Sequence, residues 1–183
     1  MKQLYKKKEL GVLAYFFENP KQEIYLRELA RRLEMNAATV MRITNFLVRE
    51  GLLQKRVERN ATYFKAILSP DFKELKKAYT VSKICGAGAI DLIKSKSVGL
   101  ASILLYGSAA RGEDDLSSDY DFLIIASKCD VKASELSAKL DREASIQVHD
   151  AASWKRASKR NRAFYLDVIS NSIALYGEKP VID

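Results

Sequence analysis

Apolar residues recur at helical spacing in three successive stretches of the first third of the chain. The stretch from Leu4 to Phe17 stops at Asn19-Pro20, and IYLRELARRLEM places its leucines on one stripe. NAATVMRITNFLVREG begins at Asn36, a side chain suited to an N-cap, and ends at Gly51, which tolerates the left-handed conformation that often follows a helix. LLQKRV and ATYFKAIL then predict a two-stranded hairpin with its turn at Glu58-Arg59-Asn60.

Helix, helix, short turn, helix and hairpin is the order of a winged helix-turn-helix. The outward side chains of the third helix are short or hydrogen-bonding, which suits a helix in a DNA major groove. The hairpin adds cations that can meet phosphate without reading sequence. The candidate DNA-binding residues are Thr39, Arg42, Asn45 and Arg49 on the helix and Arg56, Arg59 and Lys65 on the hairpin.

The charge distribution agrees with a polyanionic partner for this segment. Residues 1–68 hold 14 Lys/Arg and 7 Asp/Glu, a balance of +7, whereas the rest of the chain holds 17 and 16. The segment also resembles the winged-helix regulators of the ArsR/MarR kind over about 65 residues. That resemblance implies a DNA partner. Winged helices often pair to read two half-sites, so a homodimer is one possible assembly, which the sequence leaves open. The alternative is a winged helix that serves as a protein–protein module.

The remainder of the chain alternates apolar runs with helical stretches. Residues 68–99 predict two helical segments without the Gly/Ser or Pro run of a flexible linker. Apolar strands are then expected over 101–106, from 120 onward and from 144, followed by a C-terminal helix and a short closing strand. We therefore expect an α+β protein of two domains: residues 1–68, a helical connector at 69–99, and residues 100–183.

The stretch LLYGSAARGEDDLSSDYDFLII carries the chemistry of the second domain. Ten residues separate Ser108 from Asp119, and Asp121 follows two positions later. Positions i and i+2 of a strand share one face about 7 Å apart, so both carboxylates can meet one divalent cation. Gly107-Ser108 offers backbone N–H groups and a hydroxyl at a helix start, where phosphate binds well. A phosphate site facing a metal-binding pair suits phosphoryl transfer.

GSAARGEDDLSSDYD resembles the Gly-Ser, ten residues, Asp-x-Asp pattern of the minimal nucleotidyltransferases of the polymerase β superfamily. The resemblance covers residues 100–177 and implies a mixed sheet with flanking helices. It implies that Gly107 and Ser108 hold the phosphates of an NTP and that Asp119 and Asp121 bind Mg²⁺, with two ions in an active enzyme. Arg111 and Ser118 are weaker candidates for phosphate contacts.

Active members of that superfamily usually carry a third carboxylate on a neighbouring strand, and none is evident here. In ASIQVHDAASW, alternation places Ile146 and Val148 toward the core and Gln147 and His149 on the opposite face. Gln147 best matches the third position, and a glutamine is a poor Mg²⁺ ligand and no base. His149 is an alternative proton acceptor. Asp150, at the end of the strand, is another candidate, but the alternation of side chains places it on the opposite face from Gln147. The third alternative is an incomplete catalytic set.

Composition and the positions of the cysteines indicate the cell compartment expected for the protein. No apolar run approaches the roughly 18 residues of a membrane span, and the N-terminus is expected to be an amphipathic helix rather than a signal peptide. Cys85 and Cys129 show no metal spacing, which indicates reduced thiols in a cytoplasmic protein. The leading hypothesis is Mg²⁺-dependent transfer of NMP from an NTP to an unknown acceptor by a DNA-bound enzyme. The alternatives are a nucleotide-sensing transcription regulator and an antitoxin that acts on a HEPN-type toxin partner.

Overall fold

The computed structural model describes residues 7–182, and these divide into two compact units whose boundary lies between Lys76 and Lys77. The first unit combines helices with a small sheet, and the second combines a mixed sheet with helices, so the expected α+β class is confirmed. Helix α4 (Pro70–Gly86) runs from the end of the first unit into the second. None of the helices in the described range could span a bilayer.

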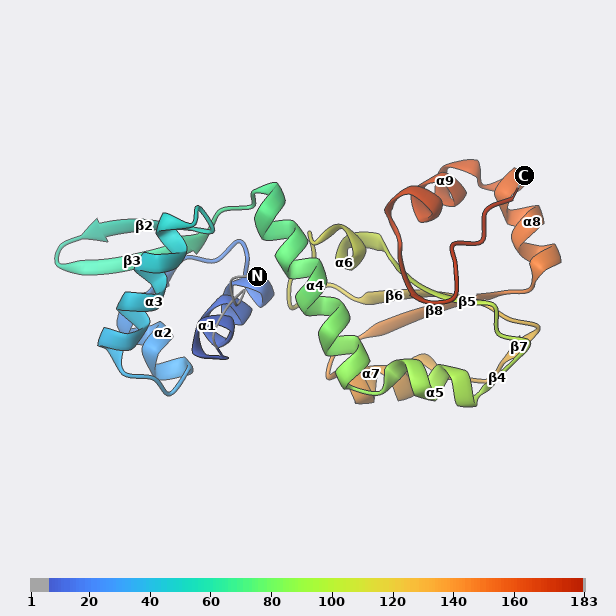
Figure 1. Ribbon diagram of the computed structural model, residues 1–183, viewed down its shortest axis with the longest axis horizontal. Coiled ribbons are helices and arrows are strands. Elements are labelled where there is room, and N and C mark those ends of the chain that lie inside the picture. The colour runs from blue at the N-terminus through green and yellow to red at the C-terminus, as the bar shows by residue number, and fades with distance from the viewer. Residues whose placement is uncertain (1–6, 183) are drawn as a thin grey trace, which may run out of the picture. The chain divides into compact units, whose positions relative to one another are not determined.

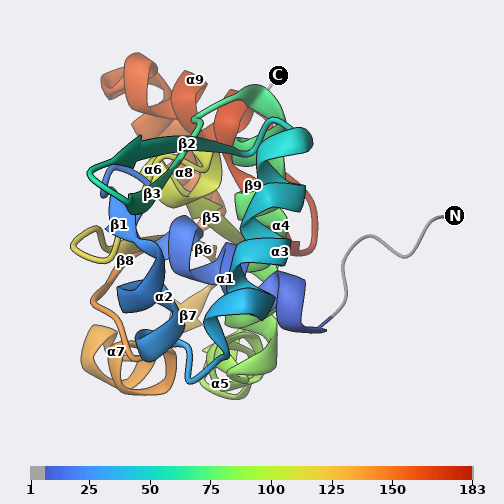
Figure 2. The same cartoon turned by 90° about the vertical axis from the view of Figure 1, so that its left-hand side faces the viewer.

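The first unit has the element order of a winged helix-turn-helix with one additional short strand. Its elements are α1 (Lys7–Glu18), β1 (Ile24–Tyr25), α2 (Leu26–Arg32), α3 (Ala37–Arg49), β2 (Leu53–Glu58) and β3 (Ala61–Ala66). The three strands pair antiparallel in the order β1-β3-β2. In Figure 2, α1 and α2 lie below the β2–β3 hairpin, and α3 rises beside it to the level of its strands.

Local sequence accounts for the boundaries of α3 and of the hairpin. The Asn36 side chain accepts a hydrogen bond of 2.8 Å from the Ala38 N–H and caps the helix, and Gly51 at φ +72° ends it. Arg59 and Asn60 both have positive φ, as the two-residue turn of a hairpin requires. The helices close over a core of fully buried side chains: Val12, Leu13, Phe16, Leu29, Val40, Ile43, Leu47 and Phe64.

Strand β1 corrects the sequence expectation for the second helix. Ile24 and Tyr25, expected to be helical, pair instead with Phe64 and Tyr63 of β3, and the helix begins at Leu26. The pairing partners lie about 40 residues away, so local periodicity could not reveal them. The predicted start of the first helix at Leu4 lies outside the described residues, which show α1 from Lys7 onward.

The second unit is built on a four-stranded sheet in the order β8-β6-β5-β9. Strands β5 and β6 pair antiparallel, as do β5 and β9, whereas β6 and β8 are parallel. A separate two-stranded sheet, β4 with β7, was not anticipated from the sequence. The elements are α5 (Ala89–Ser95), β4 (Ser97–Val98), β5 (Ser102–Tyr106), α6 (Gly107–Arg111), β6 (Tyr120–Ile125), β7 (Lys128–Cys129), α7 (Ala133–Leu140), β8 (Ala144–His149), α8 (Ala151–Arg160), α9 (Arg162–Asn171) and β9 (Ile173–Tyr176).

Helices cover both faces of this sheet (Figure 1). On one face, side chains of α5 and α7 pack against alternate residues of β5 and β6, such as Leu105 and Phe122. On the other face, Trp154 of α8 and Val168 of α9 pack on Leu104 and Leu123. The central strands are therefore apolar on both sides, as expected for strands buried between two helical layers.

Two expectations for the C-terminal part are corrected. Val148, expected in the core, is 41% exposed, because β8 is the edge strand of the sheet and only part of it is covered. The expected single C-terminal helix is two helices, α8 and α9, which meet at Asn161. The Asn161 side chain accepts a hydrogen bond from the Phe164 N–H and so starts the second helix.

Candidate functional site

Gly107 and Asp121 approach each other closely at one end of the central strands. Gly107 opens α6 directly after β5, and Asp121 lies on β6 opposite Tyr106, the last residue of β5. Gly107 has φ +71°, and an added Cβ would overlap Oδ2 of Asp121. The structure thus brings the Gly-Ser turn against the second aspartate, and a side chain at position 107 would displace the Asp121 carboxylate from this position.

The two candidate metal-binding aspartates differ in environment. Asp119 lies immediately before β6 and is exposed, and its side chain forms no hydrogen bond or ion pair within the described part of the chain. Asp121 is half-buried, and its Oδ1 accepts a hydrogen bond of 2.5 Å from the Ser145 hydroxyl of β8. One carboxylate is therefore free to rotate while the other is held by the neighbouring strand.

Strand register decides which β8 residues accompany Asp121. Ser145 is the direct partner of Asp121, and Gln147 pairs with Leu123, two residues further along. Tyr106 joins the same face from β5. Burial raises the pKa of the Tyr106 hydroxyl, and the negative charge of Asp121 raises it further, while hydrogen bonds with Ser145 and Gln147 act in the opposite direction. Beside the Asp121 carboxylate lies a neutral, hydrogen-bonding surface.

No third acid completes the pair in residues 7–182. Across that range, no cluster of three or more His, Cys, Asp or Glu side chains is placed to hold a metal ion. Asp150 is exposed and caps α8 by accepting a hydrogen bond from the Ser153 N–H. The donor set still fits one Mg²⁺, because Mg²⁺ is commonly held by one or two carboxylates together with phosphate oxygens of the substrate.

The structure places His149 away from the aspartates. It pairs with Ile125, four residues along β6 from Asp121, which is about 13 Å at strand spacing. Its ring contacts Trp154 edge-on, and its Nδ1 is buried without a hydrogen-bond partner among the described residues. Burial lowers the pKa of the imidazole. His149 therefore lies in the packing between β8 and α8, apart from the carboxylate pair.

Arg111 and Ser118 are both engaged locally. Arg111 forms ion pairs with Glu113 at 3.2 Å and with Asp167 at 3.6 Å. The Ser118 hydroxyl accepts a hydrogen bond from the Asp115 N–H. Neither side chain is held toward Asp121 by these contacts. Ser108 is half-buried in α6, and its carbonyl accepts a hydrogen bond from Glu113 N–H.

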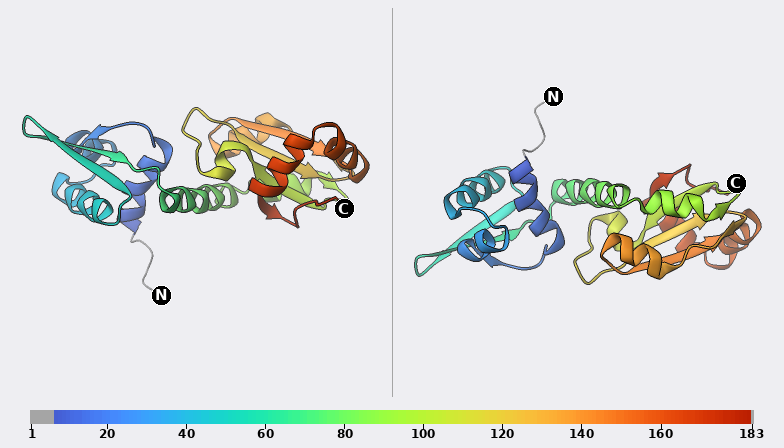
Figure 3. Two further views of the ribbon diagram at one scale, coloured as in Figure 1. Left: turned by 90° about the horizontal axis from the view of Figure 1, so that it is seen from above. Right: turned by 90° about the horizontal axis from the view of Figure 1, so that it is seen from below.

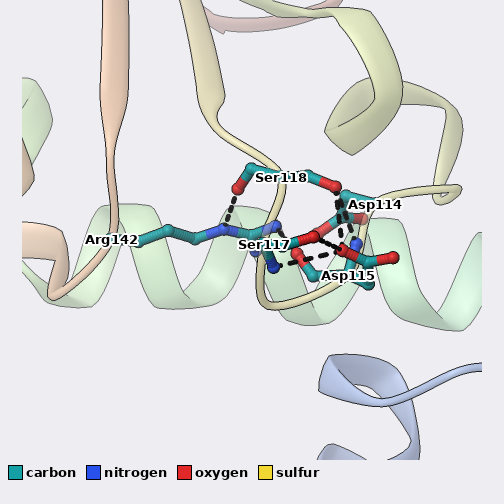
Figure 4. Close-up of polar contacts among 5 residues, drawn as sticks. All are labelled: Asp114, Asp115, Ser117, Ser118 and Arg142. Atoms are coloured by element: carbon teal, nitrogen blue, oxygen red, sulfur yellow. Dashed lines mark hydrogen bonds and ion pairs between the residues drawn. The ribbon is translucent and has the colours of Figure 1, made fainter. Parts of the chain in front are cut away.

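Arg142, like Ser145, is a residue of this region that the sequence did not indicate. Figure 4 shows its guanidinium bound to the loop that leads from α6 into β6. It donates to Asp114 Oδ2 at 2.9 Å, to the Ser118 carbonyl at 2.5 Å and to the Asp115 carbonyl. The side chains of Arg142 and Asp114 are 7% and 2% exposed. Arg142 belongs to no motif, and its contacts span more than 20 residues of sequence, so no local signal could have found it.

In the first unit, the candidate DNA-binding residues of α3 share one helical face. Thr39, Arg42, Asn45 and Arg49 are spaced by three, three and four positions, and Arg42 and Arg49 are exposed. Lys55 of β2, which was not among the candidates, donates to Asn45 at 3.3 Å and so joins this face. Both views of Figure 3 show the tip of the hairpin, with Arg59 at its turn, extending past the helices of this unit.

Arg56 is less available for phosphate than the other hairpin cations. Its guanidinium forms ion pairs with Glu23, at 2.6 Å, and with Glu58, and it lies 4.6 Å from the centre of the Tyr63 ring. The hydrogen bond from Arg56 lowers the pKa of Glu23. Lys65 pairs across the hairpin with Gln54 and is half-buried. The two glutamates offset the charge that Arg56 would bring to a DNA backbone.

Comparison with known proteins finds similarity in both parts of the chain. Similar solved structures include a toxin-antitoxin with AMP-PNP, at 22% identity and TM-score 0.39, and a mutant of the toxin-antitoxin MntA-HpeT, at 20% and 0.38. Each match covers 50% of this chain and 72% of the other chain. No curated protein matches the chain. Residues 8–56, which carry α1 to α3 and most of β2, match the IclR helix-turn-helix domain, so the N-terminal unit contains a helix-turn-helix of the IclR type.

Proposed function

We propose that the C-terminal unit binds an NTP with Mg²⁺ and transfers its nucleoside monophosphate to an acceptor, while the N-terminal unit binds DNA. In this proposal Asp119 and Asp121 hold the metal ion, and Gly107 and Ser108 receive the phosphates. The observation that carries it is the close approach of Gly107 to Asp121 Oδ2, at a distance that leaves no room for a side chain. The absence of a side chain at Gly107 lets the Asp121 carboxylate lie against the turn whose backbone N–H groups would receive the phosphates.

The residues have separate tasks in the proposed reaction. The Ser145 hydroxyl holds Oδ1 of Asp121, so Oδ2 is the oxygen turned toward Gly107. Bound Mg²⁺ would offset the phosphate charge and orient the leaving group. The acceptor hydroxyl oxygen bonds to the α-phosphorus, the bond to the β-phosphate oxygen breaks, and pyrophosphate leaves. The acceptor proton passes to water, because no third carboxylate lies beside the pair in residues 7–182.

The test is label transfer from NTP radioactive at the α-phosphate, with Mg²⁺, to a cell extract and to the protein itself. The wild-type chain should label an acceptor and release pyrophosphate, and Asp119→Asn and Asp121→Asn should each abolish both. Asp91→Asn is the matched control, since Asp91 is an exposed aspartate at the start of α5. Equal labelling by all four proteins, or labelling by none, would reject the proposed activity.

A second candidate function is a nucleotide-sensing regulator that binds NTP without transferring it. The neutral Ser145 beside Asp121 favours this candidate. A serine hydroxyl carries no negative charge to help bind a second metal ion, and it cannot act as a general base. The sensor hypothesis predicts that Mg²⁺ and NTP change the affinity of the full chain for DNA without release of pyrophosphate. DNA affinity that is unaffected by NTP counts against a sensor.

A further inference from the structure

Arg142 and Glu143 form hydrogen bonds with the backbone on both sides of Asp119 and none with the Asp119 side chain. The Ser118 carbonyl, on one side of Asp119, accepts a hydrogen bond of 2.5 Å from Arg142 Nε. The Tyr120 N–H, on the other side, donates to the Glu143 carbonyl at 2.9 Å. Two consecutive residues ahead of β8 therefore hold both peptide groups that flank the first aspartate.

The same guanidinium reaches further into the loop. It binds the Asp115 carbonyl and Asp114 Oδ2, and it lies 4.2 Å from the centre of the Tyr120 ring (Figure 4 shows the polar contacts). Asp115 in turn accepts hydrogen bonds from Ser117 N–H and from the hydroxyl of Ser117. The loop between α6 and β6 is thus tied to one planar side chain, whose five donors in a fixed fork suit several acceptors at once.

The buried ion pair between Arg142 and Asp114 is not expected to add much to the free energy of unfolding. A buried ion pair often contributes no more than well-packed apolar residues of the same volume, because both charges lose their hydration. What Arg142 and Asp114 do supply is a defined geometry for the loop. Asp119 depends on that geometry, because its own carboxylate has no partner within the described residues. Asp121, in contrast, has Ser145, so one short segment, residues 142–145, positions both carboxylates.

We infer that Arg142 is a positioning residue for the nucleotide site, acting through the Ser118 and Asp115 carbonyls to hold Asp119 where it can share one divalent cation with Asp121. The inference rests on the proposed Mg²⁺–NTP site, and it requires only binding, not transfer. It assigns to Arg142 no contact with the nucleotide. The effect of Arg142 must then pass through Asp119 and must depend on the metal ion.

Calorimetric titration of the full chain with ATP, in Mg²⁺ and in EDTA, tests this. Arg142→Met should weaken binding in Mg²⁺ by about tenfold or more, the range found when residues that orient metal ligands are replaced. Binding in EDTA should be unchanged. Because Arg142→Met leaves Asp114 buried without its arginine, the paired variant Arg142→Met with Asp114→Leu removes both charges and keeps a folded reference. It should show the same metal-dependent loss.

A double-mutant cycle with Asp119→Asn separates positioning from a general structural effect. If Arg142 acts through Asp119, then Arg142→Met adds no further loss to the Asp119→Asn protein. Glu143→Ala is the matched control, because it keeps the backbone carbonyl that Tyr120 uses. Wild-type affinity of the folded Arg142→Met, Asp114→Leu protein in Mg²⁺ overturns the inference. So does an equal loss in EDTA. Mg²⁺-dependent ATP binding without label transfer rejects only the proposed activity, whereas absence of that binding rejects both.

Discussion

The hydroxyl of Ser145 donates a hydrogen bond of 2.5 Å to Oδ1 of Asp121, and the two residues are direct partners across the parallel strands β8 and β6. The neighbouring-strand position beside the aspartate is therefore occupied by a neutral hydroxyl. Ser145, rather than Gln147, is the residue that contacts Asp121 from β8. A substitution at position 145 is therefore the most direct way to test how this site binds a metal ion.

Ser145→Asp should strengthen metal binding. A carboxylate at this position would lie beside Asp121, so like charges should lower the free energy of unfolding by about 2 kcal/mol without metal, as the hydrogen bond to the charged group is also lost. Mg²⁺ should restore that stability, and the rise in melting temperature with added Mg²⁺ should exceed that of the wild type. Differential scanning calorimetry with and without Mg²⁺ measures both effects.

Gln147→Asp is the control for position. Gln147 lies two residues further along β8, about 7 Å away at strand spacing. We expect this variant to gain little Mg²⁺-dependent stability. A larger gain from Gln147→Asp than from Ser145→Asp would contradict the assignment from strand register and would support the assignment from sequence alone.

Gly107→Ala should abolish Mg²⁺–ATP binding. The new Cβ would overlap Asp121 Oδ2, and alanine at φ +71° costs about 1–2 kcal/mol of backbone strain. Gly51→Ala is a close match, because Gly51 has φ +72° and nothing within 4 Å of an added Cβ. Gly51→Ala measures the loss of stability from the positive φ alone, and Gly107→Ala should lose more in thermal melts because of the added overlap. Only Gly107→Ala should lose nucleotide binding by calorimetry. ATP affinity retained in a folded Gly107→Ala protein would argue against the phosphate site.

DNA binding should depend more on Arg42 and Arg49 than on Arg56. Each phosphate contact contributes about 0.9 to the slope of log K against log salt for duplex DNA. Arg42→Ala or Arg49→Ala should therefore reduce that slope by up to about one where the side chain meets phosphate. Arg56→Ala should change it less, because Glu23 and Glu58 already pair with the guanidinium. Fluorescence anisotropy over a salt series measures the slopes, and a larger effect from Arg56 would refute the ranking.

His149 should make the stability of the protein sensitive to mild acid. Burial lowers the pKa of this imidazole below its ordinary value of 6.5, so the unfolded chain takes up the proton first as the pH falls. The contribution of neutral His149 to the free energy of unfolding is fully present above pH 6.5. It is lost as the pH falls through the lower pKa of the folded state. His149 is the only histidine in the chain. Urea unfolding at pH 7.5 and pH 5.5 should show a smaller change for His149→Gln than for the wild type.

Local sequence determined much of this protein. The caps and turns at Asn36, Gly51 and Asn60, the helical stripes and the two apolar runs around Gly107-Ser108 are short-range features, and they placed the winged helix, the central strands and the aspartate pair. Such features can be predicted from the sequence alone, because backbone preference and side-chain periodicity act within a few residues.

Only the tertiary structure decided what surrounds the pair. Strand register set Ser145 and not Gln147 beside Asp121, and moved His149 to the packing under α8. The contacts of Arg142 with residues 114–118 and the pairing of Ile24 with Phe64 join distant segments. A change of register by two residues keeps the alternation of faces intact, so the sequence pattern cannot distinguish these positions. The packing of β8 against β6 does.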